Sequence, residues 1–269
     1  MKALIDSDSI LYKVCCSVEE KTIWNECEYE AGIEDEPIVT YSSDLDSCIT
    51  LFNGIIENIL FATECDDYEL HFTGNSNFRN TNPLGYKANR KELRKPLLFN
   101  ELKEYVLNAH KGILNEGIEA DDMVVYLKTK YPEDYLLCAI DKDVLYQTPG
   151  THYDYNNDKV ITVDEKDAIR FLYYQCLVGD TSDGYIGCRG VGKVNANKLL
   201  GDVKHKLTNL EYATELYRTV EDAYIKKGHT IDDFLNTLKL ADMHQIDVVN
   251  NKVKIRGIKH PTDPFNTGV

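Results

Sequence analysis

The sequence lacks the patterns of a disulfide-stabilised, zinc-binding or membrane-spanning protein. Its eight cysteines include no Cys-x-x-Cys pair, and histidine and cysteine form no cluster that offers a zinc site. No apolar run approaches the length needed to cross a bilayer. The apolar start of the chain is interrupted at Asp6 and Asp8, too early for a signal peptide. We therefore expect reduced, mostly packed thiols, a cytoplasmic location and no membrane partner.

Positive charge is also scarce, with 30 lysines and arginines against 45 aspartates and glutamates and a net charge of −15. Taken alone, this balance argues against a nucleic-acid partner. The cations are not evenly spread, however, because six of them stand against the single anion Glu92 between Arg79 and Lys95. A phosphate ligand responds to the local field rather than to the net charge. The overall charge therefore does not exclude nucleic acid.

Apolar strands alternate with helices along a chain of 269 residues, which is long enough to bury a substantial core. This order predicts an α/β fold with a mostly parallel central sheet flanked by helices. Residues 74–96 form a polar, basic connection without periodicity, which indicates a functional or mobile segment. Strands are expected at 2–5, 68–73, 135–140, 151–155 and 159–163, a hairpin at 21–41, and helices through Leu11 and Val14 and at 43–62, 100–111, 119–131, 164–178 and 193–200. The last 65 or so residues are expected to be mostly helical with a strand-like tail.

Acidic residues follow the predicted strands or open the predicted helices. Asp6 and Asp141 each end a strand, and ligands of parallel α/β sheets bind beyond the carboxyl ends of strands, so both should face one crevice. Three motifs, GIEADD, DKD and GDTSDG, supply further acids: Glu119, Asp121, Asp122, Asp143, Asp180 and Asp183. Each cluster alone could be a helix N-terminus or a turn. Four clusters in such places instead indicate paired Mg²⁺ ions, which hold the water and leaving oxygen of a phosphodiester.

The basic stretch and a glycine-spaced turn are the other two features with a chemical interpretation. A solvated loop would explain the cations around Lys87, but Phe78 and Tyr86 are available for stacking on bases, and a cation here could neutralise a phosphate. The turn from Gly187 to Lys193 enters a helix and could present backbone N–H groups to a phosphate. A packing role in a helix-turn-helix is the alternative for this turn.

In this order, GIEADD, DKD, GDTSD and GxxGVGxxxA, with YKANRK after the third strand, resemble the 5′ nuclease family. That family comprises flap endonucleases, the 5′-nuclease domain of bacterial DNA polymerase I and, most similar of all, bacteriophage 5′–3′ exonucleases. The resemblance covers about residues 1–201. It implies a PIN-like 5′ nuclease fold, with an α/β nuclease core at 1–180 that carries a helical arch or loop at about 74–112. A helix-turn-helix-type DNA-binding and helical region is implied at 181–269.

The resemblance also implies roles for individual residues. The first metal would be served by Asp6, Glu119, Asp121 and Asp122, and the second by Asp141, Asp143, Asp180 and Asp183. Catalysis would depend on Lys87, Arg90 and Asp141. DNA would be bound by Arg79, Tyr86, Lys87, Arg90, Lys91, Gly187, Gly190, Gly192 and Lys193. The metals would be two Mg²⁺ ions, with Mn²⁺ as a substitute, and K⁺ is a further candidate at the 187–196 turn. Gly74 stands where the family usually carries an Asp, so Asp8 or a water would substitute there.

We therefore predict a divalent-metal-dependent 5′–3′ exonuclease and structure-specific flap endonuclease. Its substrates would be DNA with 5′ ends or flaps, with RNA in RNA–DNA hybrids as a further candidate. It would act in phage DNA replication or degradation, in the host-cell cytoplasm. Two alternatives stay open: a haloacid-dehalogenase-type phosphatase, from Asp6-Ser7-Asp8 and the later Asp180 and Asp183, and a DNA-binding protein whose metal site Gly74 has impaired. The phosphatase leaves GIEADD and YKANRK without a role.

Overall fold

A six-stranded sheet in the order β5-β4-β1-β6-β7-β8 forms the centre of the molecule. The computed structural model describes residues 1–30, 32, 36–90, 93–203, 207–250 and 252–256. The strands are β1 (Lys2–Asp6), β4 (Asp67–Asn77), β5 (Ile113–Gly117), β6 (Tyr135–Ala139), β7 (Gly150–Asp154) and β8 (Lys159–Val163). All neighbouring pairs are parallel except β7 with β8. The predicted α/β class with a mostly parallel sheet is confirmed.

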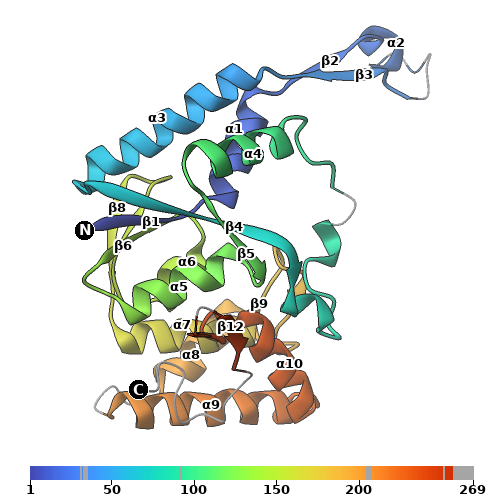
Figure 1. Ribbon diagram of the computed structural model, residues 1–269. Coiled ribbons are helices and arrows are strands. Elements are labelled where there is room, and N and C mark those ends of the chain that lie inside the picture. Colours follow the sequence, from blue (N-terminus) through green and yellow to red (C-terminus); the bar gives the residue numbers. More distant parts are fainter. Residues whose placement is uncertain (31, 33–35, 91–92, 204–206, 251, 257–269) are drawn as a thin grey trace.

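Helices cover both faces of this sheet (Figure 1). One face carries α1 (Asp8–Val18), α3 (Leu45–Thr63) and α4 (Phe99–Ala109), and the other carries α5 (Ala120–Lys130) and α6 (Lys142–Gln147). Side chains alternate across a strand, so Ala3 and Ile5 join the first core while Leu4 joins the second. The central strand β1 is therefore buried on both faces, and its end at Asp6 is held firmly.

Helix α3 corrects the expectation that no apolar run could cross a bilayer. It is 19 residues long and apolar enough to pass that test by length and composition, which by itself is weak evidence for a membrane span. Four of its side chains, Cys48, Phe52, Ile56 and Ile59, are buried in the same core as α1 and α4. Asp44 caps it, accepting a hydrogen bond from the amide of Ser47 at 2.8 Å, so the helix begins two residues after its predicted start at 43.

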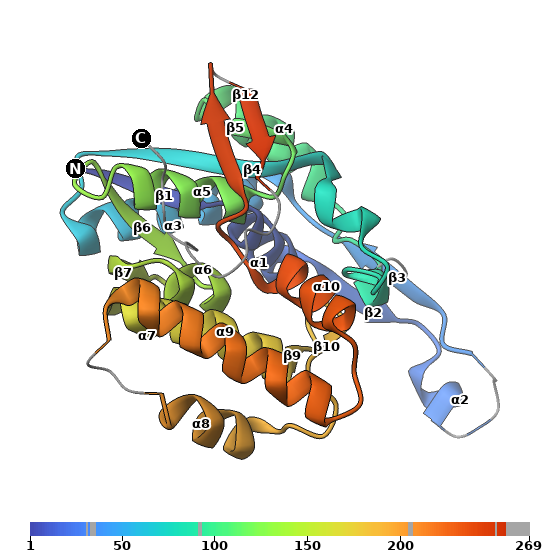
Figure 2. The ribbon, with the colours of Figure 1, turned by 90° about the horizontal axis from the view of Figure 1, so that it is seen from below.

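A second helical layer follows the sheet (Figure 2). It contains α7 (Glu165–Val178), α8 (Lys193–Gly201), α9 (Asn209–Lys226) and α10 (Ile231–Ala241), with the short strands β9 (Gly179–Asp180) and β10 (Tyr185–Ile186) between α7 and α8. Buried residues of α7 and of α8 to α10 form one hydrophobic cluster. The chain then forms the antiparallel pair β11 (Ile246–Val249) and β12 (Lys252–Ile255), which confirms the strand-like tail expected from the sequence. The division of the chain at residue 180 stays a prediction.

Two excursions leave the central sheet. The predicted hairpin is formed by β2 (Glu20–Ile23) and β3 (Val39–Ser42), with α2 (Glu26–Glu30) between them, and it extends away from the body (Figure 1). The basic connection from β4 to α4 contains two short 3-10 turns, η1 (Phe78–Thr81) and η2 (Ala88–Arg90). Seven cysteines are free among the described side chains, and six of these are buried, as expected for packed thiols.

Candidate active site

The ends of adjacent parallel strands bring acidic side chains to one cleft. Asp6 is the last residue of β1, and Asp141 follows the neighbouring strand β6 and caps α6. Glu119 caps α5 and Asp121 lies in its first turn. With Asp8, these four carboxylates line a cleft of about 890 Å³. The expectation that Asp6 and Asp141 face the same crevice is confirmed.

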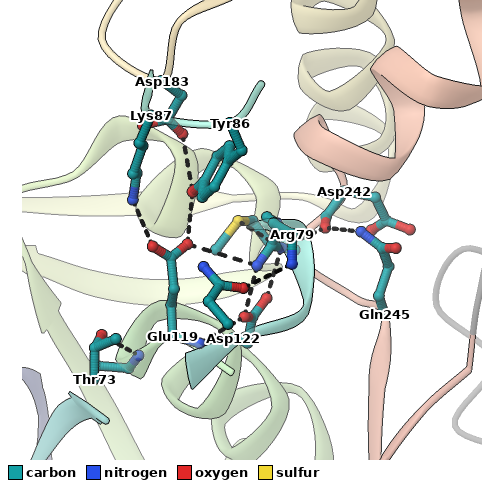
Figure 3. Close-up of polar contacts among 12 residues, drawn as sticks. Thr73, Arg79, Tyr86, Lys87, Glu119, Asp122, Asp183, Asp242 and Gln245 are labelled. Carbon is teal, nitrogen blue, oxygen red and sulfur yellow. Dashed lines mark hydrogen bonds and ion pairs between the residues drawn. The ribbon is translucent and has the colours of Figure 1, made fainter. Parts of the chain in front are cut away.

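Local hydrogen bonds fix the walls of this cleft. The Thr73 amide in β4 donates to Oδ2 of Asp8 at 2.8 Å, and the Thr73 hydroxyl accepts from the amide of Ala120 at 3.0 Å (Figure 3). Thr73 therefore connects the first turns of α1 and α5 to the sheet. Asp141 accepts from the amide of Asp143 at 2.8 Å, as a helix-capping aspartate does. The acids are thus placed by secondary structure rather than by a mobile loop.

Burial and mutual repulsion disfavour the ionised form of the carboxylates in this cleft. Burial, together with the charges of Asp8 and Asp141, raises the pKa of Asp6 to about 7. Burial and the charges of Asp6 and Asp141 raise the pKa of Asp121 well above its ordinary value. The charge of each of these carboxylates therefore disfavours ionisation of its neighbours. A divalent cation would offset this repulsion.

Of the four acids predicted for a second metal, Asp141 lines this cleft, while Asp143, Asp180 and Asp183 lie beside it without lining it. Burial and Asp141 raise the pKa of Asp143 to about 7, although Lys142 and the Gln175 amide oppose the shift. Burial would raise the pKa of Asp180 too, but an ion pair with Lys142 outweighs it and the pKa lies below its ordinary value. Burial raises the pKa of Asp183 against the nearby cation of Lys87.

Basic residues of the β4–α4 connection line the same cleft and pair with acids there. Lys87 Nζ donates to Oε1 of Glu119 at 2.7 Å and lies 3.7 Å from Asp183 Oδ1 (Figure 3). The Lys87 backbone has a φ of +49° and its amide donates to the Asp183 carbonyl at 2.8 Å. Arg90 donates to Oδ1 of Asp183 at 3.1 Å. Both cations line the cleft, where a phosphate could replace a carboxylate as their partner.

Tyr86 has a structural partner instead of an open stacking face. Its side chain is buried, at 6% exposure, and its hydroxyl donates to Oε2 of Glu119 at 2.6 Å. Burial raises the pKa of Glu119, but the fields of Lys87 and Arg79 and two hydrogen bonds outweigh it, so that pKa lies below its ordinary value. The prediction that Tyr86 stacks on bases is therefore corrected: the ring is enclosed by the protein.

Arg79 and Asp122 are corrected in the same way. Arg79 was predicted to contact DNA, yet it is 2% exposed, and its two terminal nitrogens each donate to an oxygen of Asp122 at 2.7 Å (Figure 3). Asp122 has no exposed surface and also accepts from the Glu119 amide. A bidentate pair of this kind leaves Asp122 no open ligand position. Lys91, predicted to bind DNA, lies outside the described residues.

The fit of these residues to a metal can be judged from their present partners. Among the described residues, no group of three or more His, Cys, Asp or Glu side chains is arranged as a ready metal site. Lys87, Lys142 and Arg79 neutralise Glu119, Asp180 and Asp122. Asp6, Asp121 and Asp141 line the cleft without such an ion pair among the interactions found in the described part of the chain. Their hard oxygen donors and surplus charge fit a divalent cation.

The glycine turn separates into packed and open positions. A Cβ on Gly187 would lie 2.4 Å from the Gly179 amide nitrogen and 2.5 Å from the Leu177 carbonyl, so this glycine permits a close backbone approach. Gly187 therefore has the packing role that was the alternative for this turn. Gly190 has a φ of +82°, and Gly192 caps α8 with no atom within 4 Å of an added Cβ. These two and Lys193 are exposed and remain candidates for DNA contact.

Some residues of the cleft were missed or left open by the motifs. Asp8 lines the cleft, and its signal was the Asp-x-Asp pattern after the first strand. Lys103 of α4 also lines it and donates to the Thr73 carbonyl at 2.5 Å, without any signal in the sequence. At Gly74 a Cβ would lie 2.6 Å from the Asn115 carbonyl and the Glu116 carboxylate. An Asp at position 74 therefore does not fit here, while Asp8 lies nearby and accepts a hydrogen bond from the amide of Thr73.

Known proteins match the chain in sequence over part of its length. No protein-family model matches it. DNA polymerase I of Caldicellulosiruptor bescii is 30% identical over 135 residues, which is 43% of this chain and 16% of the polymerase. The 5′-3′ exonuclease of Aquifex aeolicus is 29% identical over 143 residues, 47% of this chain and 50% of the exonuclease. Flap endonuclease Xni of Shewanella halifaxensis is 24% identical over 169 residues, 58% and 64% of the two chains. The chain thus spans less than two thirds of each relative.

Solved structures match over most of the chain. The bacteriophage T5 D15 protein crystallised with metal ions superimposes with a TM-score of 0.59, covering 90% of this chain and 88% of that protein at 14% identity. A variant of the T5 D15 flap endonuclease in complex with DNA and metal ions gives a TM-score of 0.52, over 72% and 80% of the two chains at 15% identity. The chain resembles the 5′ nucleases in sequence and has their fold. The resemblance predicted from the motifs is confirmed, and with it the 5′ nuclease fold.

Proposed function

We propose that the protein is a divalent-metal-dependent 5′ nuclease, which hydrolyses DNA phosphodiesters as a 5′–3′ exonuclease and as a structure-specific flap endonuclease. One observation carries the proposal. The mutually repelling carboxylates of Asp6 and Asp121 line the same cleft as the cations Lys87 and Arg90. Carboxylates that suit a metal ion, together with cations that suit a phosphate, are what hydrolysis of a phosphodiester needs. The exonuclease and flap endonuclease relatives support this interpretation.

The residues of the cleft would divide the work between metal and substrate. Asp6, Asp121 and Asp141 would hold Mg²⁺, with Mn²⁺ as a substitute. When bound, such ions activate water and neutralise charge on the phosphate. Lys87 and Arg90 would bind and orient the scissile phosphate by exchanging their present carboxylate partners, Glu119 and Asp183, for phosphate oxygens. Asp143, Asp180 and Asp183 would serve a second ion once Lys142 and Lys87 are drawn to the substrate.

The duplex part of the substrate would be held outside the cleft. The exposed turn at Gly190 and Gly192 opens α8, and Lys193 is its first residue. Backbone amides and a lysine at a helix N-terminus suit phosphate rather than base edges, so recognition would follow the shape of the DNA. K⁺ at residues 187–196 and RNA in RNA–DNA hybrids belong to the same proposal. The setting would be phage DNA replication or degradation in the host cytoplasm.

A flap assay tests the function. A 5′-labelled flap substrate is incubated with Mg²⁺ or with EDTA, and the product lengths are read on a gel. Cleavage near the flap junction and from the 5′ end is expected only with Mg²⁺. Asp121→Asn should abolish cleavage and keep DNA binding, whereas the exposed Asp66→Asn should cut as the wild type does. The absence of cleavage by the wild type with both Mg²⁺ and Mn²⁺ would refute the proposal.

A DNA-binding protein without nuclease activity is the second candidate. It is favoured by the ion pairs of Lys87 with Glu119 and of Lys142 with Asp180, which occupy carboxylates that a metal would need. The same assay separates the two, because this candidate predicts a gel shift of the flap substrate with no product under any divalent ion. Hydrolysis of a small phosphate monoester without DNA cleavage would instead indicate the phosphatase.

A further inference from the structure

A segment far from the acidic motifs in sequence reaches the start of the basic connection between β4 and α4, hereafter the basic loop. The segment Ala241–Ile246, hereafter the C-terminal link, connects α10 to β11. Arg79 of η1 donates to the carbonyl of Asp242 at 2.9 Å and lies 3.8 Å from the sulfur of Met243. The same guanidinium holds both oxygens of Asp122 in α5 (Figure 3). One buried side chain thus joins the basic loop, the acid-bearing helix and the C-terminal link.

The C-terminal link is anchored independently of Arg79. The side-chain nitrogen of Gln147, at the end of α6, donates to the carbonyl of Ala241 at 2.7 Å. Its side-chain oxygen accepts from the amide of Met243 at 3.1 Å, and its backbone carbonyl lies 2.8 Å from Nε2 of His244. Gln245 donates to the carbonyl of Asp242 at 2.8 Å. The Asp242 carbonyl is therefore a fixed acceptor, which Arg79 meets without having to organise it.

The position of Arg79 in turn determines how the basic loop lies over the cleft. The guanidinium carbon is 5.9 Å from the centroid of the Tyr86 ring, and one terminal nitrogen is 3.6 Å from Oε2 of Glu119. Tyr86 and Lys87 both donate to that glutamate. Nearby, the side chain of Asn82 donates to the carbonyl of Asn236 in α10 at 3.0 Å. The base of the loop is therefore attached to the C-terminal region at two points.

We propose that the C-terminal link is a working part of the nuclease site and that Arg79 is the positioning residue through which it holds Lys87 and Arg90 over the cleft. The catalytic side of this inference rests on the proposed function. The planar guanidinium is needed because it donates to a carboxylate and a carbonyl at once in a fixed geometry. A lysine retains the charge but cannot form that fork. The C-terminal region thereby acquires a role in the cleft that no motif of the sequence assigns to it.

The test compares three variants of the full chain. Arg79→Lys removes the fork, and Gln245→Ala loosens the Asp242 acceptor without touching the cleft. Thr219→Ala is the control, because it removes a side-chain hydrogen bond to the Glu215 carbonyl within α9, away from both attachment points of the loop. Hydrogen exchange is measured at the amides of Lys87 and Arg90, which bond to Asp183 and Lys87 carbonyls. Single-turnover cleavage and DNA affinity are measured in parallel.

Arg79→Lys and Gln245→Ala should each accelerate exchange at these loop amides by about tenfold or more, because the loop opens locally more often. They should slow single-turnover cleavage by about tenfold while DNA affinity changes less than about twofold, as expected for misplaced but present cations. Thr219→Ala should do neither. Equal exchange in wild type and Gln245→Ala would overturn the inference, as would equal acceleration by the control. If Arg79→Lys does not fold, Gln245→Ala decides. A wild type that cuts no DNA refutes the proposed function alone, since exchange still reports on the loop.

Discussion

At the scale of single residues, Lys87 is the cation most directly placed for chemistry. Burial lowers the pKa of Lys87, but the negative charges of Glu119 and Asp183 outweigh burial and raise this pKa to about 12. The side chain is therefore charged at neutral pH. We expect Lys87→Ala to reduce the single-turnover cleavage rate by about 10²–10³-fold, the loss typical of one electrostatic contact to a transition state. DNA affinity should fall less than about tenfold. The exposed Lys159→Ala is the control. An unchanged rate would remove Lys87 from the mechanism.

Asp6 allows a test of the cleft's surplus charge without measuring activity. Its pKa in the fold is raised to about 7, above the value near 3.8 expected when unfolded. Because folding raises this pKa, the Asp6 carboxyl contributes most to the free energy of unfolding below about pH 3.8. That contribution is lost as the pH rises through 7. In EDTA, Asp6→Asn should therefore melt at a higher temperature than the wild type at pH 8, by roughly 2–4 °C or more, and show little difference at pH 4.

The metal supplies the converse expectation for the same pair of proteins. Mg²⁺ at pH 8 should raise the melting temperature of the wild type, because a ligand that binds only the folded state stabilises it. The gain should be smaller in Asp6→Asn, and Asp66→Asn should behave as the wild type does. If Asp6→Asn is no more stable than the wild type in EDTA at pH 8, the assignment of surplus negative charge to this site is wrong.

The residues that were predicted correctly share a simple physical cause. Asp6 and Asp141 could be paired from the sequence because adjacent parallel strands must end on the same side of a sheet. The pairing of Arg79 with Asp122 could not be predicted, because the position of a residue in a charged segment does not determine the direction of its side chain. Arg79 follows a strand that ends at Asn77, four residues beyond its predicted end, and its side chain pairs with Asp122 of α5. A burial pattern of that kind depends on contacts between segments far apart in the chain.

At the scale of elements, the long periodic segments were all recovered, whereas some short ones were not. The predicted helices at 43–62, 119–131 and 164–178 correspond to α3, α5 and α7 with ends within two residues. Strand β5 and helix α6 were missed. Strand β5 reads Ile-Leu-Asn-Glu-Gly and offers only two apolar residues, and α6 has six residues, less than two turns. Neither has enough periodicity to be seen without its neighbours.

The glycine turn before α8 provides a prediction at this scale. Gly187→Ala should lower the free energy of unfolding by about 1–3 kcal/mol, because the new Cβ would clash with backbone atoms within 2.5 Å, which cannot move without distorting the turn. Gly192→Ala meets open space, so its cost should stay below about 1 kcal/mol, the range of a changed helix cap. Urea melts of the two variants make the comparison. Equal stability losses would mean that the turn does not pack as described.

Two variants of the exposed part of this turn test DNA contact. If the exposed turn grips duplex, Gly192→Ala and Lys193→Ala should weaken binding to a long duplex and leave binding to a short single strand unchanged. Electrophoretic mobility shifts with both ligands measure this. Equal loss on the two ligands would argue against a duplex-gripping turn.

At the scale of the whole molecule, the fold joins the hydrophobic cores on the two faces of the sheet to a further core formed by α7 to α10. The C-terminal link and Arg79 connect them beside the cleft. The sequence predicted an α/β core followed by helices. It could not predict that the last helices return to the catalytic loop, because this contact joins Arg79 to Asp242 across 163 positions of the chain.

The charge of the whole molecule leads to an expectation for DNA binding. With 45 acids against 30 cations, the surface repels the phosphate backbone except where cations gather. Five cations line the cleft: Lys13, Lys87, Arg90, Lys95 and Lys103. If each met one phosphate, the affinity would fall with salt with a logarithmic slope no steeper than about −5. Divalent ions among Asp6, Asp121 and Asp141 should raise the affinity by about tenfold or more, because they cancel the charge that opposes the DNA at the centre of the cleft.

The slowly cutting Lys87→Ala variant makes this measurable, with one lining cation fewer and an expected slope no steeper than about −4. Fluorescence anisotropy of a labelled flap substrate is followed from about 50 to 200 mM KCl, with Mg²⁺ and with EDTA. A steeper slope would mean that cations outside the cleft, such as those of the α8 turn, carry much of the binding. An affinity that Mg²⁺ does not change would mean that the acids of the cleft are already neutralised by protons or lysines when DNA binds. The metal would then have no place in substrate recognition, whatever its part in hydrolysis.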